Sequence, residues 1–225
     1  MRSFPRIHHR FWSLAATCAL LLTLVTLALA KDKTFSLPRA FHAKTYPAND
    51  VHTDEKLAIA ADPYDTADKA GAVFSVKYRE EELLPIHLII SNDGDRTISL
   101  AEMKVVFITN KGTKIDPERT EDIFRQISHQ RQRPGPSANP LPLPRKRPRA
   151  VSQEAQSEVE GAQFMAQAVE PHSTQAGFLF FDVNGVDNPL AGGRLVITGI
   201  MNSEGHEVFF FEIPFEKYLT YQPLK

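Results

Sequence analysis

Apolar side chains recur at every second position near the end of the chain, and this spacing constrains the fold more than any other feature. Phe209, Phe211, Ile213 and Phe215 follow this two-residue repeat. Successive side chains of a β-strand point to opposite faces, so the repeat predicts that all four share one face. A strand with one aromatic face needs a second layer against which to bury it. The pattern therefore predicts a β-rich domain with an apolar core.

Further segments of this kind are separated by turn residues. Residues 72–78 alternate and predict a half-buried strand, and the apolar run 83–91 predicts a central strand with His87 facing outward. Asn92-Asp93-Gly94 is a turn signal because these residues tolerate a positive φ. Other strands are expected near 57–61, 97–100, 103–109, 163–169, 175–183, 194–201 and 206–215. Seven or eight short strands without alternating helices predict an all-β, antiparallel sandwich.

One short helix is expected among the strands. Asp116 and Pro117 resemble a helix start, with Asp as the cap and Pro at the first helical position. Ile123 and Ile127 are four residues apart, so they would bury one face of a helix that ends near Gln130.

The first thirty residues predict export from the cytoplasm. Arg2, Arg6 and Arg10 precede an uncharged stretch, residues 11–30, which ends in Ala-Leu-Ala. A basic start, an apolar middle and small residues at the end are typical of a signal peptide. The stretch is also long enough to remain as a signal anchor, in which case residues 11–30 would be the only membrane contact. Either alternative predicts an extracytoplasmic protein: periplasmic, secreted or membrane-anchored.

The cysteine content limits how the exported part can be stabilised. Cys18 is the only cysteine, and it lies inside the apolar stretch rather than at its end. Lipidation is therefore not predicted, and a cleaved chain would have neither disulfides nor thiolate ligands. About 195 residues would remain, enough for one hydrophobic core.

The distribution of charge is uneven. Residues 131–150 hold six cations, no acid and six of the sixteen prolines. Without residues 1–30 the chain has 23 basic and 27 acidic side chains, a net charge of −4. Without residues 131–150 as well, it has 17 basic and 27 acidic side chains, a net charge of −10. The sequence thus predicts an acidic domain interrupted by a basic, proline-rich segment.

The basic segment is predicted to belong to a long disordered loop. Proline-rich sequence with few apolar residues cannot bury enough surface to offset its ordering entropy. The polar, acidic stretch after it extends the predicted loop to 131–161. The expected organisation is a signal peptide or anchor at 1–30, an irregular arm at 31–70 and one domain at 71–225 interrupted by this loop.

Three stretches resemble small immunoglobulin-like domains of exported bacterial proteins, many of which have no assigned function. They are LLPIHLIISNDGDRTISL at 83–100, MKVVFITNKGTKIDP at 103–117 and VEPHSTQAGFLFFDV at 169–183. The resemblance covers about 71–215 without the loop and rests on packing and turn motifs. It implies an immunoglobulin-like β-sandwich and no particular activity.

The sequence contains no pattern that specifies catalysis, a metal or a cofactor. The histidines lack the short spacings that place two imidazoles on one metal, and Ser173 beside His172 is adjacency rather than a triad. Two oxygen-rich stretches are weak candidates for calcium, although turn chemistry explains such residues as well. They comprise Asp62, Asp65 and Asp68 in the first and Asp182, Asn184, Asp187 and Asn188 in the second.

We therefore expect a non-enzymatic exported module that contacts an envelope component. The anion-binding candidates are Arg145, Lys146, Arg147 and Arg149, and the expected partner is an anionic polymer bound without nucleic-acid sequence recognition. One alternative is an accessory subunit that binds an envelope protein by a sheet edge. A calcium-binding or hydrolytic protein is another alternative, and the basic segment could also be a solvated insertion without a role.

Overall fold

The computed structural model describes residues 35–128 and 150–220. All of them belong to one unit, Phe35–Lys225. The described residues form ten strands in three antiparallel sheets, so the prediction of a predominantly β fold is confirmed. They also form four α-helices and one 3-10 helix, more than the one helix that the sequence predicts.

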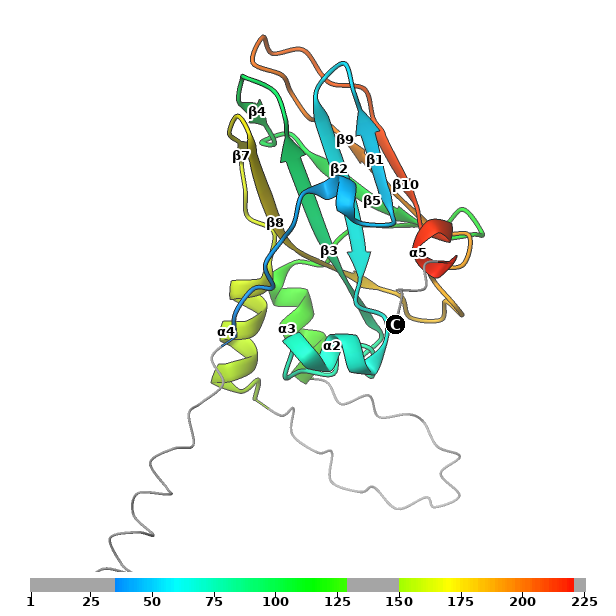
Figure 1. Ribbon diagram of the computed structural model, residues 1–225. Helices are drawn as coiled ribbons and strands as arrows, with labels where there is room; N and C mark the ends of the chain where they lie inside the picture. The colour runs from blue at the N-terminus through cyan, green and yellow to red at the C-terminus, as the bar shows by residue number, and fades with distance from the viewer. Residues whose placement is uncertain (1–34, 129–149, 221–225) are drawn as a thin grey trace, which may run out of the picture. The chain divides into compact units, whose positions relative to one another are not determined.

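Two four-stranded sheets make up most of the fold (Figure 1). The first sheet has the order β1-β2-β3-β8, with β1 at Asn49–His52, β2 at Leu57–Pro63, β3 at Leu83–Asn92 and β8 at Ser173–Asp182. The second sheet has the order β10-β9-β5-β6, with β5 at Lys104–Ile108, β6 at Lys114–Ile115, β9 at Arg194–Thr198 and β10 at Phe211–Pro214. A small third sheet pairs β4 (Ile98–Ser99) with β7 (Ala168–Val169).

The main hydrophobic core lies between the two large sheets. Alternate residues of β3, including Leu84 and Leu88, pack in one cluster with Phe107 of β5 and Phe211 of β10. All ten residues of β3 are buried. The predicted central strand is thus confirmed, and it pairs with β8 along its whole length, from Leu83 opposite Asp182 to Asn92 opposite Ser173.

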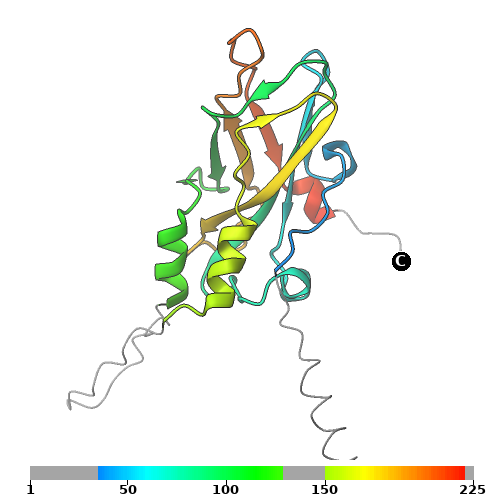
Figure 2. The same cartoon turned by 90° about the vertical axis from the view of Figure 1, so that its left-hand side faces the viewer.

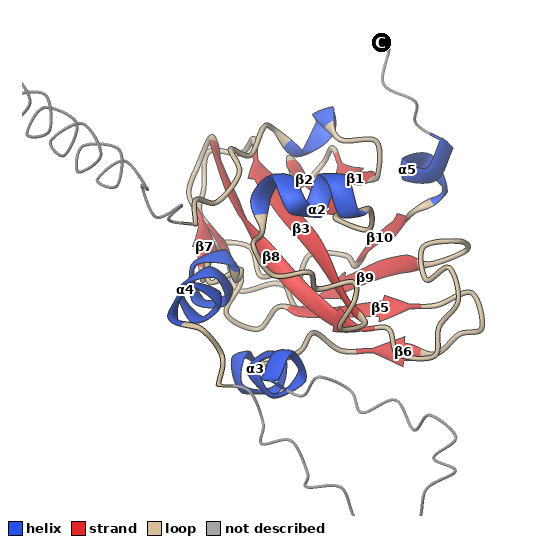
Figure 3. Cartoon of the chain, turned by 90° about the horizontal axis from the view of Figure 1, so that it is seen from below, coloured by secondary structure: helices blue, strands red, loops and turns tan. Residues whose placement is uncertain are grey.

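The α-helices cover part of the other face of the first sheet, and the 3-10 helix η1 (Ala43–Thr45) covers the part around Ala58, Ala60 and Ile89. The remaining residues of β3 face outward from the main core, and Leu83 packs in a second cluster with Ile123 and Val159. These side chains come from the helices α3 (Thr120–Ser128) and α4 (Gln153–Ala162). In Figure 1, α2 (Ala67–Val73), α3 and α4 lie below the two large sheets, and Figure 3 views the molecule from that end. Both faces of β3 are therefore covered, and this explains its continuous apolar sequence.

The predicted strand over residues 72–78 is wrong. Its first part belongs to α2, and Phe74 and Tyr78 follow in turns that insert both rings into the second cluster. Alanine is the strongest helix former, and Thr66 caps the helix by accepting a hydrogen bond from the Lys69 backbone amide at 3.3 Å. These helix-forming preferences outweigh the alternation of only four apolar residues over 72–78.

Three further expectations need correction. The stretch 31–70, expected to be an irregular arm with one short strand, supplies β1 and β2. The predicted 131–161 loop contains all of α4 except its last residue, because Ser152 caps a helix that buries Val159 and Ala162. Phe209 was expected in the core with Phe211 but is 68% exposed, since β10 begins only at Phe211.

Candidate functional site

The four predicted anion-binding residues, Arg145, Lys146, Arg147 and Arg149, lie outside the described residues. The structure does describe both flanks of their segment. Helix α3 ends at Ser128, and the described chain resumes at Ala150, shortly before α4. The two helices contact each other and lie side by side in Figure 2. The basic segment therefore leaves and re-enters the domain through a pair of neighbouring helices, which we call the helical base.

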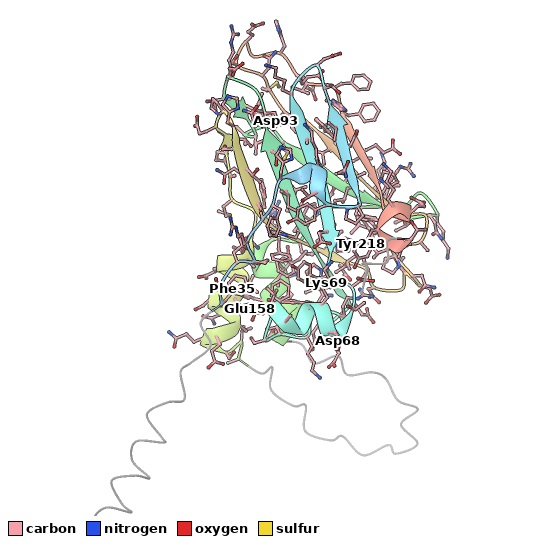
Figure 4. The ribbon with its side chains drawn as sticks, viewed as in Figure 1. Phe35, Asp68, Lys69, Asp93, Glu158 and Tyr218 are labelled. Atoms are coloured by element: carbon pink, nitrogen blue, oxygen red, sulfur yellow. The ribbon has the colours of Figure 1, made fainter. Side chains whose placement is uncertain are left out.

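A buried carboxylate fixes α4 in this base. Glu158 is 3% exposed and accepts hydrogen bonds from the Ser75 backbone amide at 2.6 Å and from the Ser75 hydroxyl at 2.7 Å. It also accepts from the Val76 amide at 3.2 Å and from the Tyr78 hydroxyl at 2.9 Å. Burial and Glu158 together raise the pKa of Tyr78, so this phenol keeps its proton. Glu158 lies among the helices (Figure 4), and its four donors satisfy the charge of the carboxylate without a cation.

Further contacts join the base to the first sheet. The Thr120 hydroxyl donates to Gln163 Oε1 at 2.9 Å and thereby links the start of α3 to the end of α4. The Phe164 amide then donates to the Phe178 carbonyl of β8 at 3.0 Å. Only glycine fits at position 177 beside this crossing, because a Cβ there would lie 2.5 Å from the Phe164 Cα atom. The base is thus fastened to the first sheet through its edge strand β8.

The surface next to the base is acidic. Glu118, Asp122, Arg125, Gln126 and Asp182 line a hollow of about 370 Å³. Burial raises the pKa of the Glu118 carboxyl, and the neighbouring charges of Asp122 and Asp182 raise it further. Arg125 pairs with Asp122 at 2.9 Å and partly offsets this repulsion. The domain therefore presents negative charge close to the point where a positively charged segment begins.

A second polar cluster surrounds Lys69. Its ammonium group lies 2.6 Å from Asp62 Oδ1 and 2.7 Å from the Pro63 carbonyl, and 4.7 and 4.8 Å from the ring centres of Tyr64 and Tyr218. The Tyr218 hydroxyl donates to Asp65 Oδ1 at 2.7 Å. Tyr218 belongs to α5 (Glu216–Thr220), so the cluster fastens the end of the described chain to α2 (Figure 4).

The ionisable groups of this cluster are strongly perturbed. Burial raises the pKa of Asp62 against the opposing charge of Lys69. Burial also raises the pKa of Tyr64 to about 12, and burial and the bond to Asp65 raise the pKa of Tyr218. Such shifts occur at functional sites and in structural networks alike. Here each group already has an internal partner, so the cluster fits a structural role.

The two calcium candidates do not assemble as ligand sets. Asp62 and Asp65 converge on the Lys69 and Tyr218 side chains, while Asp68 is exposed on α2. In the second stretch, Asp182 Oδ1 accepts from the Asn184 amide at 2.9 Å, which is an Asx turn. Across residues 35–128 and 150–220, no group of three or more His, Cys, Asp or Glu side chains could hold a metal ion.

The predicted outward orientation of His87 is wrong. Its side chain is 1% exposed and stacks on Phe178 at 4.7 Å between ring centres. Burial, with a contribution from Lys69, lowers its pKa to about 4. The helices that cover this face of β3 explain the burial, since the sequence prediction left the face open to solvent.

Ser173 and His172 do not form a catalytic pair. The Ser173 hydroxyl donates to the Glu170 carbonyl at 2.7 Å, while His172 Nε2 lies 3.1 Å from Asp95. His172 also has a positive φ of 52°, so it occupies a tight turn before β8. The two side chains are neighbours in the sequence but bond to different groups and not to each other.

The loops at the opposite end from the helices gather charged side chains. Asp93, labelled in Figure 4, contacts Lys44 Nζ at 2.6 Å and His42 Nε2 at 2.7 Å. Hydrogen bonds from Lys44 and His42 hold the pKa of Asp93 below its usual value. Two exposed phenylalanines, Phe209 and Phe210, lie in the loop that leads into β10, with ring centres 4.7 Å apart.

Sequence reasoning missed Glu158 and the exposed pair Phe209 and Phe210. The signal for Glu158 was present, because Ser152 is a good helix cap and Ala155, Val159 and Ala162 recur at helical spacing. The acidic composition of the stretch concealed that pattern. For the aromatic pair, alternation placed Phe209 inward, and nothing in the sequence marks the true start of β10.

No helix among the described residues is long and apolar enough to cross a membrane. No family model, curated protein or solved structure with which the chain was compared matches it.

Proposed function

We propose that the two large sheets form an immunoglobulin-like β-sandwich. In such domains one sheet contains strands A, B and E as neighbours, and the other has the order G-F-C-C′. The order β2-β3-β8 fits A-B-E, and the order β10-β9-β5-β6 fits G-F-C-C′. Under this assignment the basic segment lies in the connection between C′ and E, with α3 before it and α4 after it.

The proposed role is that of a non-enzymatic exported interaction module. Its rigid domain presents the basic segment to an anionic polymer or surface outside the cytoplasm, such as lipid headgroups or acidic glycans. Arg145, Lys146, Arg147 and Arg149 are the proposed contact residues. Export through residues 1–30 is part of the same proposal.

The helical base carries this proposal. A segment with six cations interrupts a chain whose other residues beyond position 30 have a net charge of −10. Its two flanks are helices that contact each other and are anchored by Glu158 and by the bond between Thr120 and Gln163. Such a base would let the segment project without disturbing the core. The acidic hollow beside the base places negative charge on the domain, opposite in sign to the segment.

A sheet-edge mode of binding has less support. Of the four edge strands of the two large sheets, β6 has only two residues. Strand β8 has ten, but its Phe178 and Phe180 carbonyls already accept hydrogen bonds from the Phe164 and Glu118 amides. The edge strands β1 and β10 contact each other, and the Glu212 amide donates to Asp50 Oδ2 at 2.9 Å. Open edges suited to strand addition are long and unpaired.

Neutralising two of the proposed contact residues is expected to weaken binding to anionic vesicles. Each Lys or Arg near an anionic surface contributes about 1 kcal/mol, so R145Q/R147Q loses about 2 kcal/mol, or about 30-fold in affinity. The measurement is sedimentation of residues 31–225 with vesicles that contain phosphatidylserine, alongside neutral vesicles.

The matched control is K77Q/K104Q, which removes two exposed cations of the domain. We expect it to bind almost as well as the wild type. Equal binding by R145Q/R147Q and the wild type, or equal losses in both double variants, would contradict the proposed role of the segment.

A further inference from the structure

A groove lies among the loops at the end of the sheets opposite to the helical base. It has a volume of about 330 Å³ and lies between the β1–β2 turn, the loop after β3 and the loop before β10. Its charged lining consists of four carboxylates and two cations. Lys56 pairs with Asp95 at 3.3 Å and Arg96 with Glu204 at 2.8 Å, which leaves a net charge of −2 from Asp54 and Glu55.

An exposed aromatic pair adjoins this groove. Val208 lines the groove, and Phe209 and Phe210 follow it directly. The two rings are 68% and 42% exposed, and His52 lies 6.5 Å from the Phe209 ring. Adjacent exposed aromatic rings are unfavourable in water, and they are typical of surfaces that bind a partner.

Exposed aromatic rings beside carboxylates that no Lys or Arg neutralises suit one class of ligand in particular. An extended proline-rich peptide packs its rings on aromatic side chains and loses little entropy on binding, because it is already extended. Cations that follow the prolines can pair with the carboxylates. Residues 140–149 of this chain read PLPLPRKRPR, which has both features in that order.

We propose that residues 140–149 of one copy bind the groove and the Phe209–Phe210 pair of a second copy. The cations of residues 140–149 complement the net negative charge of the groove, and these residues belong to the chain outside the described structure. The proposal uses the basic segment but does not rest on its binding of anionic polymers.

The cations at 145–149 cannot reach the groove of their own chain. Strand β3 runs from Leu83, which packs against the helices, to Asn92, which lines the groove. The nine steps from Leu83 to Asn92 span about 30 Å. Arg145 lies five residues before Ala150 and therefore within about 18 Å of it. Figure 1 shows the start of α4 on the side away from the sheets, which lengthens the distance further.

The contact joins two different surfaces, so it is head-to-tail. Such contacts extend into chains or close into rings, and their extent rises with protein concentration. Because the cations and carboxylates involved are exposed, the association weakens as salt screens them.

Two variants that complement each other test this proposal. Residues 31–225 contain the whole unit Phe35–Lys225, which has its own cores. In that protein, F209S/F210S removes the aromatic pair, and replacement of residues 131–150 by a short Gly-Ser linker removes the segment. F41S, at a position that is 60% exposed, is the matched control for loss of an exposed ring.

Sedimentation velocity over a concentration series is the measurement. The wild type and F41S are expected to self-associate, while each of the two test variants alone stays monomeric. An equimolar mixture of the two test variants forms one-to-one pairs of about twice the monomer mass, because one supplies the segment and the other the groove. A monomeric wild type, or a mixture that stays monomeric while the wild type associates, overturns the proposal. Binding of F209S/F210S to anionic vesicles is measured separately, so failure here is distinguishable from failure of the proposed function.

Discussion

Replacement of Glu158 by alanine is expected to lower the free energy of unfolding by about 3 kcal/mol or more. The carboxylate accepts four hydrogen bonds, and a bond to a charged group contributes about 1.5–3 kcal/mol. Ser75 is exposed and its donors regain water, but the Tyr78 hydroxyl is buried and loses its partner. Chemical denaturation of residues 31–225 in urea measures the change.

The control for this prediction is Glu160→Ala on the same helix. Glu160 is exposed, so the same substitution there is expected to change the unfolding free energy by no more than about 0.5 kcal/mol. Tyr78→Phe removes one of the four bonds and is expected to cost about 1–2 kcal/mol. Equal effects at positions 158 and 160 would contradict the buried network and, with it, the rigid helical base.

Acidification is expected to destabilise the protein through His87. Its pKa is 6.5 when exposed and about 4 in the folded state, so between these values the unfolded chain binds a proton that the folded chain does not. Stability is therefore unaffected above pH 6.5, falls as the pH drops towards 4 and levels off below. The difference between the two pKa values corresponds to a loss of about 3 kcal/mol in the free energy of unfolding.

A comparison with His87→Leu isolates this contribution. Asp62 acts in the opposite sense, because a raised pKa lets the folded state take up a proton first, but it is present in both proteins. We expect the difference in unfolding free energy between wild type and variant to be constant above pH 7 and to change by about 3 kcal/mol between pH 6.5 and 4. If the unfolding free energies of the two proteins changed in parallel over this range, His87 would be protonated equally well in the folded and unfolded states.

The strands that the sequence predicted best are those buried on both faces or bounded by strong turns. The run at 83–91 became β3, and the Asn92-Asp93-Gly94 turn follows it directly. The expected helix near 116–130 became α3, with Ile123 buried as its spacing predicted. The predicted start at Asp116 and Pro117 is wrong, because the helix begins at Thr120. Hydrophobic periodicity and turn chemistry are local signals, and they are sufficient where both agree.

Three of the errors share one physical cause. The prediction assumed a two-layer fold in which the outer face of β3 is exposed, but helices cover that face. The same omission placed His87 outside, made residues 72–78 a strand and left α4 unrecognised. A third layer is a tertiary property, since Glu158 and Tyr78 are 80 residues apart and no local pattern joins them.

The groove next to Phe209 and Phe210 was equally beyond local reasoning. It is built from three loops that are distant in sequence, and its charge follows from which carboxylates find a cation. The basic segment, in contrast, is apparent from composition alone, although composition does not show that its flanks are paired helices.

The most direct test of the central claim is the salt dependence of binding to a linear polyanion. Residues 31–225 would be titrated with a homopolymeric single-stranded oligonucleotide, a generic probe, from about 50 to 200 mM salt. If all six cations of residues 131–150 contact phosphates, the slope of log K against log salt is about −4. The account predicts this slope for the wild type and no measurable binding after replacement of residues 131–150. A slope near zero, or the same slope in both proteins, would contradict it.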